Sequence, residues 1–496
     1  FVFIQEPGMC ESEILKKFVQ IVPSLYNPDY NETCKANWKW MEEFQSSNEA
    51  WIVCFQVMKT GVSEEITFYA ALTLQTKIRY EIENMPISQQ NEIFGFLVEY
   101  LKEYRPKMKI TREICIALAK IAVKCPEWVN AFAHVVRELG LIRTSSTNYE
   151  DFGPEKSIVY FISEYADGIQ DVGATRKDQI RLELGTSFED ISKMLEYFLN
   201  LFSSDLNYSK LIYKTFGELV ATGSFLFDKV VESSVFQNIM LSISSYGSVD
   251  LDIINICAQA FNDCISLLIF NDQTERAGYY EKFQTFSSKL FPIALTATEN
   301  SDYEYLKCLM EIHLALLDGF EEEVINDAQF NDCHIFLDVV SRICDFNDAR
   351  LLFETFNFWI DFTTHVINSV FNQTFLYPFF EKYGNICIHQ IYKKMPVEME
   401  YINETLYVLD NNDVTDFRIQ SLGTLISLFS IIDPANYYNL VMSHIKTGQL
   451  NILQMEASLY FLLGVLPSCK NLNFDDLIQI ILSFSADSPK LLLETS

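Results

Sequence analysis

The sequence has 496 residues, and 67 Asp and Glu against 37 Lys and Arg give it a formal charge of −30. This charge excludes a nucleic-acid binder that relies on counterion release, because no cluster of basic residues outweighs the repulsion of a polyanion. The hydrophobic share of 49% excludes a disordered chain, and the length exceeds the ~250 to 300 residues of a single core. We therefore expect several domains or an open-ended repeat.

The sequence offers no support for catalysis. Its 12 cysteines include no C-x-x-C pair, and its six histidines include no H-E-x-x-H frame, so we expect neither a metal site nor a cofactor. Glycine loops for phosphate and the G-x-S-x-G nucleophile motif are absent too, so no enzyme is predicted. The thiols are expected to be free and buried in a reducing compartment. No run reaches the ~18 apolar residues of a membrane span, so we expect a soluble intracellular protein without membrane insertion.

Gly and Pro together make up only about 6% of the chain, which disfavours turn-rich β architectures. The first 8 residues are expected to be an unstructured upstream segment. Helical periodicity then begins. In 66–79, one face carries Ala70 and Leu74 and the opposite face carries Phe68 and Leu72.

The same pattern continues toward the other end of the chain. Segment 111–124 has apolar residues at i, i+4, i+7 and i+8, and 191–202 and 419–429 repeat this stripe. The stretch 141–155 is polar and is expected to be a long loop between helices, not a domain linker. Helices of about 12 to 18 residues are predicted, each ending before a break such as a proline.

A helix that is apolar on two sides must be sandwiched between others. The arrangement that achieves this without one large core is a superhelical α-solenoid, in which each helix pair touches only its neighbours. We predict an all-α fold of HEAT-type antiparallel helix pairs, with roughly ten to eleven repeats at about 40 to 47 residues each. Two or three unrelated helical bundles remain the alternative.

Specific segments then resemble a known family. The stretch 35–78 contains FQSSNEAW followed by FYAALTLQTKI, and 114–128 reads ICIALAKIAVKCPEW. Both resemble the first repeats of the importin-β superfamily of nuclear transport receptors. Three later segments, GATRKDQI at 173–180, TFNFWI at 355–360 and DFRI at 416–419, resemble the transportin-SR branch, the transportin-3 and Mtr-ten type.

The resemblance implies a domain plan and partners. Residues 9–140 would be amino-terminal importin-β-like repeats that bind the GTP form of the GTPase Ran, and 141–496 would be further HEAT-type repeats, truncated relative to the family. It further implies nuclear pore proteins as partners, basic or arginine-serine-rich protein cargo, and shuttling between cytoplasm and nucleus. An acidic inner surface suits basic partners. The direction of transport and the oligomeric state stay open.

The resemblance also places a Ran surface on 37–44, 66–79 and 111–124. The candidate residues on the solvated side of these helices are Gln75, Lys77, Arg79, Arg112 and Lys120. An acidic run would meet the basic flank of the GTPase, and it consists of Asp318, Glu321, Glu322 and Glu323. Trp51 and Trp128 are expected in the core. Arg176 and Lys177 are expected in an exposed loop, and no role is assigned to them.

A second hypothesis stays open, in which the chain is a HEAT-repeat scaffold of a multiprotein complex and not a transport receptor. It shares the architecture but predicts no binding to Ran. The fold alone does not decide between the two.

Overall fold

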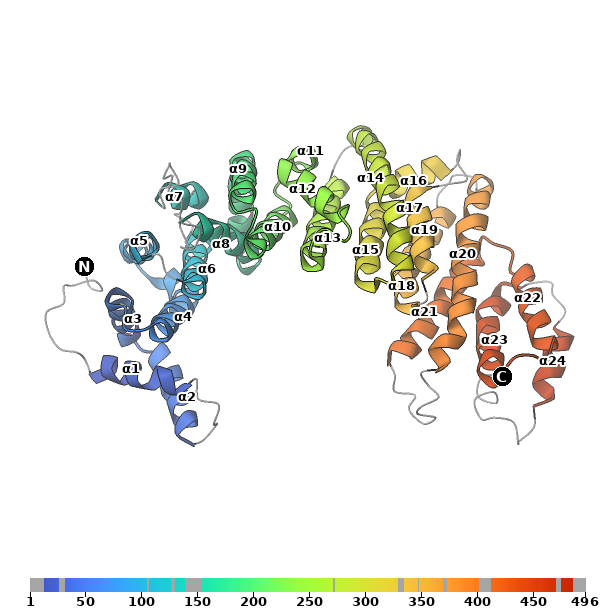
Figure 1. The fold of residues 1–496 in the computed structure, drawn as a ribbon, viewed down its shortest axis with the longest axis horizontal. Helices are drawn as coiled ribbons and strands as arrows, with labels where there is room; N and C mark the ends of the chain where they lie inside the picture. The colour runs from blue at the N-terminus through green and yellow to red at the C-terminus, as the bar shows by residue number, and fades with distance from the viewer. Residues whose placement is uncertain are drawn as a thin grey trace. The chain divides into compact units, whose positions relative to one another are not determined.

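The computed structural model describes residues 13–25, 32–104, 107–125, 130–138, 154–270, 273–328, 334–346, 348–368, 373–400, 412–469 and 474–484. Every regular element in these ranges is a helix, which confirms the predicted all-α fold (Figure 1). The predictions for 1–8, for Trp128 and for the loop before Pro154 concern residues outside these ranges.

The chain divides into two compact units, and α13 (Leu251–Ser266) contributes to both. Unit 1 comprises Phe1–Met240 and Gln259–Leu267, and unit 2 comprises Leu241–Ala258 and Leu268–Ser496. Each unit is described by itself below.

Unit 1 is a stack of helix pairs. In it α3 packs on α4, α5 on α6, α7 on α8 and α9 on α10, while α4, α6, α8 and α10 form a row in which each helix packs on the next. The helices that begin in this unit are α1 (Glu13–Leu25), α2 (Glu32–Gln45), α3 (Glu49–Thr60), α4 (Glu64–Glu81), α5 (Ile87–Tyr104), α6 (Met108–Lys124), α7 (Ala131–Glu138), α8 (Pro154–Asp167), α9 (Ala174–Leu201), α10 (Leu206–Ala221), α11 (Phe227–Glu232) and α12 (Ser234–Ile243).

Unit 2, taken by itself, is also a stack, in which α14, α15 and α17 pack together, α17 packs on α20, and α20, α21 and α23 pack together. Its helices after α13 are α14 (Gln273–Glu299), α15 (Tyr303–Gly319), α16 (Glu321–Ala328), α17 (Ile335–Cys344), α18 (Ala349–Phe353), α19 (Phe356–Asn368), α20 (Gln373–Glu400), α21 (Asn412–Leu428), α22 (Ala435–Lys446), α23 (Ile452–Val465) and α24 (Asp475–Leu482). Stacked pairs in both units make the described fold an α-solenoid, as predicted.

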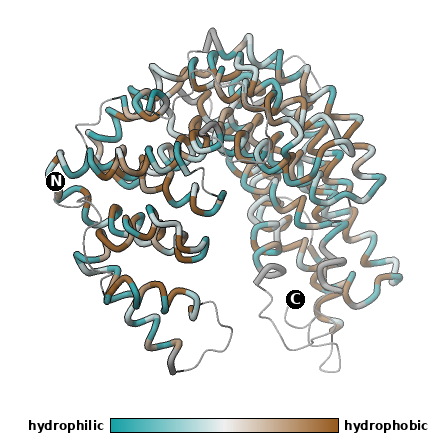
Figure 2. The backbone as a smooth tube through the Cα atoms, turned by 60° about the vertical axis from the view of Figure 1, so that its left-hand side comes forward, coloured by the Kyte–Doolittle hydropathy of each residue, from teal (hydrophilic) through white to brown (hydrophobic). Residues whose placement is uncertain are grey.

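Helix α6, in the row formed by α4, α6, α8 and α10, is buried around most of its circumference. In α6, Ile114, Leu118 and Ile121 are buried as the periodicity predicted, and Cys115 and Ala119 on other sides of the helix are buried as well. Figure 2 shows hydrophobic and hydrophilic residues mixed along the helices. The small side chains on α6 let α4, α5 and α8 approach closely. The ten cysteines in the described ranges are free and buried, as expected.

Some helix boundaries differ from the sequence prediction. Helices α9, α14 and α20 have 28, 27 and 28 residues, longer than the 12 to 18 expected. Helix α14 continues through Pro292 because packing against α15 and α17 outweighs the one backbone hydrogen bond that proline cannot donate. Helix α9 begins at Ala174, so Arg176 and Lys177 lie in its first turn and not in a loop.

A close approach of α9 to the turn after α10 generates a stability prediction. A Cβ on Gly185 would lie 2.7 Å from the backbone oxygen of Ser224, whereas a Cβ on Gly95, in α5, meets no atom within 4 Å. We expect Gly185→Ala to destabilise unit 1 by about 1–3 kcal/mol through overpacking. The control Gly95→Ala should stabilise it by about 0.5–1 kcal/mol through helix propensity. Urea unfolding of both variants checks this, and equal effects of the two substitutions would contradict the close approach.

Candidate binding surfaces

Lys77, a predicted contact residue, lies inside unit 1 with 2% of its surface exposed. Its ammonium group donates to the backbone oxygens of Ser47 at 2.9 Å and Gln45 at 3.3 Å and pairs with Glu81 Oε1 at 2.6 Å. The indole Nε1 of Trp51 donates to Glu81 Oε2 at 2.9 Å, and Trp51 is buried as expected. Lys77 therefore ties the end of α2 to α4, and its predicted exposure is wrong.

Lys120 is also buried, with 8% of its surface exposed, although the helical wheel places it opposite the apolar stripe of α6. Its ammonium group pairs with Asp171 Oδ2 at 2.6 Å. The wheel prediction is wrong here because α6 contacts α4, α5 and α8 and keeps little solvated surface. The other candidates in unit 1 reach solvent: Gln75 is half-buried, and Arg79 and Arg112 are exposed.

In a repeated interaction, a basic side chain donates hydrogen bonds to backbone oxygens at the carboxyl end of another helix. Lys124 Nζ donates to the backbone oxygen of Arg79, near the end of α4, at 2.7 Å. Arg176 donates to the backbone oxygens of Ala122 at 2.6 Å and Val123 at 3.0 Å, near the end of α6. This gives Arg176 the role that the sequence left open.

The same interaction occurs elsewhere in the described residues, in addition to that of Lys77 at the end of α2. Arg181 Nε donates to the oxygen of Thr222, just past α10, at 3.0 Å, and Arg276 donates to the oxygen of Gly319, the last residue of α15, at 2.7 Å. Lys394 donates to the oxygen of Cys344, the last residue of α17. The last carbonyls of a helix lack partners within it, so these cations satisfy acceptors that the helix itself cannot pair.

A row of carboxylates crosses the inner helices of unit 1. It consists of Glu164 on α8, Glu218 on α10 and Asp263 on α13, and we call it the unit 1 carboxylate row. Ser163, beside Glu164, donates its hydroxyl to Glu218 Oε2, and a Cβ on Gly217 would lie 3.1 Å from Asp263 Oδ2, so the row is continuous from helix to helix. The sequence did not lead us to predict this row. The recurrence of one carboxylate per helix pair is the pattern that could have revealed it.

These carboxylates are partly desolvated. Burial raises the pKa of Glu164, the positive charge of Arg112 opposes this rise, and Asp167 and Glu218 add to it. Burial raises the pKa of Asp263 to about 6, with a hydrogen bond from Gln259 opposing the shift. Like charges in low-dielectric surroundings stabilise a nearby cation, and Lys214 of the chain itself already pairs with Glu218 Oε1 at 3.1 Å.

The acidic run in unit 2 spans the end of α15 and the first turn of α16. Glu323 pairs with Arg276 at 3.1 Å, and Glu321 lies 3.1 Å from His365 Nδ1. Asp318 and Glu322 are exposed. The run is thus not a uniformly solvated patch, because Glu321 and Glu323 face basic groups of the chain itself.

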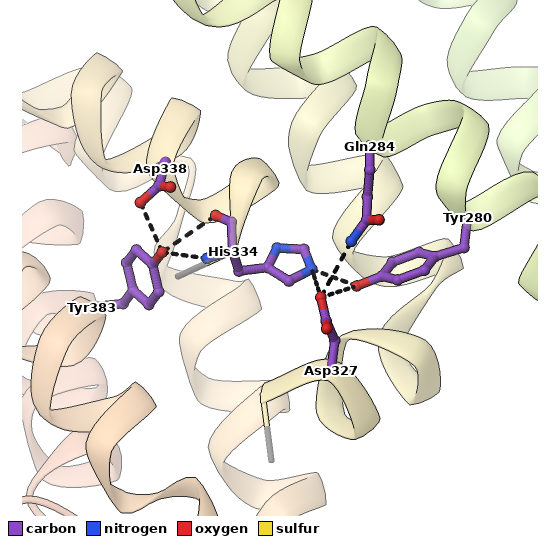
Figure 3. A network of polar contacts seen from close by, with 6 residues as sticks. All are labelled: Tyr280, Gln284, Asp327, His334, Asp338 and Tyr383. Atoms are coloured by element: carbon purple, nitrogen blue, oxygen red, sulfur yellow. Dashed lines mark hydrogen bonds and ion pairs between the residues drawn. The ribbon is translucent and has the colours of Figure 1, made fainter. Parts of the chain in front are cut away.

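A buried polar network joins α14, α16, α17 and α20 in unit 2 (Figure 3). The hydroxyl of Tyr280 lies 2.6 Å from His334 Nε2, and the hydroxyl of Tyr383 donates to Asp338 Oδ1 at 2.7 Å and accepts from the backbone N–H of His334 at 2.6 Å. Burial lowers the pKa of His334 to about 4, so its ring is neutral at pH 7. The network fixes the packing of these helices. Because unfolding releases His334 to bind a proton, the free energy of unfolding falls as pH drops from about 6.5 toward 4.

One open groove of about 590 Å³ lies between α20 and α22 in unit 2. Its acidic lining residues are Asp345, which follows α17, Glu381 on α20 and Asp433, just before α22. Within the described residues no cluster of His, Cys, Asp and Glu is arranged to hold a metal ion. The helices that the structure describes also include none long and apolar enough to cross a bilayer.

Comparisons with known proteins found a family match in the region of α2–α5. Residues 38–103 match the model of the importin-beta N-terminal domain. The chain is 29% identical over 124 residues to the uncharacterized protein C11G11.07 of Schizosaccharomyces pombe, and the match covers 24% of the chain and 13% of that relative. It is 26% identical over 127 residues to the mRNA transport regulator MTR10 of Saccharomyces cerevisiae, again covering 24% and 13%. The match thus spans about an eighth of each curated relative.

Two solved structures resemble the chain along most of its length. One is a circular tandem repeat protein with a novel repeat topology, 12% identical, with a TM-score of 0.37 over 95% of this chain and 97% of the other. The other is importin beta, crystallised in an ammonium sulfate condition, 11% identical, with a TM-score of 0.37 over 97% of this chain and 61% of the other.

The buried position of Lys77 generates a second prediction. Lys77→Met leaves the backbone oxygens of Gln45 and Ser47 and the carboxylate of Glu81 without their cation, so we expect a loss of about 2–3 kcal/mol in the free energy of unfolding. The control Lys109→Met changes an exposed lysine at the start of α6 and should stay within about 0.5 kcal/mol. Chemical denaturation measures both, and matching midpoints would show that Lys77 is a solvated residue.

The raised pKa of Asp263 generates a third prediction. The folded pKa of Asp263, about 6, lies above its ordinary value of 3.8. The neutral form of the side chain therefore contributes its full stability below pH 3.8, and this contribution is lost as pH rises through about 6. Asp263→Asn should therefore stabilise unit 1 at pH 7.5 by about 1 kcal/mol, allowing for solvent screening. At pH 5 the gain should shrink. Thermal melts at both pH values check the sign, and a gain that grows with acid would contradict the desolvation of Asp263.

Proposed function

We propose that the chain is part of a nuclear transport receptor, a karyopherin without chemistry of its own, which binds Ran in its GTP form and carries basic protein cargo. The observation that carries this proposal is the match of residues 38–103, on α2–α5, to the importin-beta N-terminal domain. The likeness to a relative named as an mRNA transport regulator supports a role in transport between nucleus and cytoplasm.

The distribution of charge supports the choice of partners. The chain carries a formal charge of −30. Within the described residues, several of its cations close helix ends inside the fold, as the hydrogen bonds of Lys77, Arg176 and Lys394 illustrate. The carboxylate row adds a partly desolvated acidic surface to unit 1. A basic protein is attracted to such a surface, and electrostatic attraction speeds association more than it adds affinity.

Burial ranks the candidate residues for the Ran surface. Gln75, Arg79 and Arg112 reach solvent from the inner helices of the first repeats, and these are the residues on which we place the contact. Lys77 and Lys120 act through the packing of those helices. In the acidic run we favour Asp318 and Glu322, because these two residues are exposed whereas Glu321 and Glu323 are half-buried. Arginine-serine-rich cargo and nuclear pore proteins remain part of the proposal through the family resemblance.

A pull-down with immobilised Ran tests the proposal. The chain should be retained by Ran loaded with a non-hydrolysable GTP analogue at least tenfold more than by Ran loaded with GDP, and retention should fall at high salt. The double variant Arg79→Glu and Arg112→Glu should weaken retention about tenfold. The matched control is Lys102→Glu with Lys109→Glu, which makes the same charge change on exposed lysines of α5 and α6.

Two outcomes would overturn the proposal or part of it. Equal retention by both nucleotide forms removes the transport-receptor function and favours the HEAT-repeat scaffold, which would instead be recovered with a constitutive partner. Nucleotide-dependent retention that the Arg79 and Arg112 variant leaves unchanged removes the residue assignment alone.

A further inference from the structure

A small pocket of about 170 Å³ lies in unit 1, between α9 and the segment that joins α10 to α11. An engineered cavity of about 150 Å³ in a protein core holds one benzene molecule, so this pocket has room for one apolar side chain. No member of the unit 1 carboxylate row lines it, so the pocket is a separate feature of the unit.

The pocket is fixed in shape by contacts between α9 and the turn after α10. Arg181 Nε donates to the backbone oxygen of Thr222 at 3.0 Å, and the hydroxyl oxygens of Thr222 and Ser224 lie 2.6 Å apart. Gly185 allows the backbone of Ser224 to approach α9, since a Cβ at this position would lie 2.7 Å from the Ser224 oxygen. A pocket that is already formed loses little conformational entropy when a side chain enters it.

The apolar lining of the pocket is partly open to solvent. Phe188 and Phe225 line it with buried rings whose centroids lie 4.4 Å apart. Leu182 and Leu226 line it as well, and 71% and 61% of their surface is exposed. A single exposed leucine is ordinary on a protein surface, but two of them beside one apolar pocket offer a partner contiguous area to bury.

The charge of the pocket is opposite to that of the chain. Arg181 and Lys229 line the pocket and no carboxylate does, although the formal charge of the chain is −30. The guanidinium group of Arg181 lies 3.8 Å from Asp178 Oδ1, which is beyond hydrogen-bond distance. At physiological ionic strength, charges more than ~8 Å away are largely screened, so a ligand in the pocket responds to these two cations more than to distant carboxylates.

The ammonium group of Lys229 is available to a ligand. Lys229 is exposed, and within the described part of the chain its Nζ makes no hydrogen bond or ion pair. The hydrogen bond and the charge of Lys193 lower the pKa of Glu189, and Lys229 adds a smaller electrostatic contribution. Glu189 is itself paired with Lys193 at 2.6 Å, so it leaves Lys229 without a direct partner.

We propose that this pocket binds an acidic segment of a partner protein, with one apolar side chain of about the size of leucine in the pocket and carboxylates on either side of it paired with Arg181 and Lys229. A neutral segment would fill the pocket but leave both cations unused, and a basic segment would be repelled by them. The Ran and cargo surfaces proposed above attract basic groups. This surface takes a partner of the opposite charge, and the inference does not rest on the proposed function.

Fluorescence anisotropy with the whole chain and a labelled peptide of Asp and Glu residues around one central Leu tests the proposal. One matched peptide replaces the Leu with Ala, and a second replaces every Asp and Glu with Asn and Gln. We expect the parent peptide to bind at least tenfold more tightly than either. Equal affinity of the Ala peptide would overturn the seating of an apolar side chain, and equal affinity of the neutral peptide would overturn the pairing with the cations.

Variants of the exposed leucines locate the site. The double variant Leu182→Gln and Leu226→Gln should weaken binding of the parent peptide at least tenfold. The matched control, Leu206→Gln with Leu241→Gln, changes two leucines that are exposed outside the pocket and should alter affinity less than twofold. Equal losses in the two double variants would show that the peptide does not occupy this pocket.

A charge variant tests the role of Lys229. Lys229→Gln should weaken binding of the acidic peptide about threefold, the size of one exposed ion pair, and should leave binding of the neutral peptide unchanged. The control Lys289→Gln removes the same charge from an exposed lysine of α14 and should change neither. A loss in the control as large as that of Lys229→Gln would assign the effect to net charge and overturn the contact. Circular dichroism of each variant confirms that a lost signal is not lost folding.

Discussion

The packing of this protein depends on cations that satisfy the carboxyl ends of neighbouring helices. A solenoid of short helices exposes many terminal carbonyls, and those at buried junctions between repeats need donors from outside their own helix. Arg176 at the end of α6 and Lys394 at the end of α17 supply such donors from about one repeat further along the chain. Each contact also holds two consecutive repeats in register, which a stack without a common core requires.

This use of cations does not remove the charge imbalance of the chain. Basic residues are outnumbered in the sequence, and several of the described ones have their charge turned inward toward carbonyls or toward carboxylates such as Asp171 and Glu81. A pair such as Lys120 with Asp171 withdraws one charge of each sign and leaves the excess of negative charge in place. Attraction for basic partners therefore follows from the excess of Asp and Glu.

The sequence was sufficient for the fold because helix periodicity is a local property. The stripe of Ile114, Leu118 and Ile121 predicted a buried face of α6, and the structure confirms it. The wheel failed for Lys120 because it divides a helix into one buried and one solvated side, whereas an inner helix of a solenoid has neighbours on several sides. The partner of Lys120 is Asp171, 51 residues away, and no local pattern reveals such a pair. The groove was hidden for the same reason, since Asp345, Gln390 and Asp433 come together only through packing.

The two acidic surfaces differ in what they offer a basic partner. In the carboxylate row, Glu164 and Asp263 are partly desolvated and carry raised pKa values, so their charged forms are strained near neutral pH. A cation that approaches the row relieves this strain, and the gain depends on charge far more than on shape. In the groove, Glu381 and Asp433 are exposed to solvent, and Asp345 accepts a hydrogen bond from Gln390 Nε2. Each surface by itself therefore attracts a basic group, the row through carboxylates that burial has partly desolvated and the groove through carboxylates that remain in solvent.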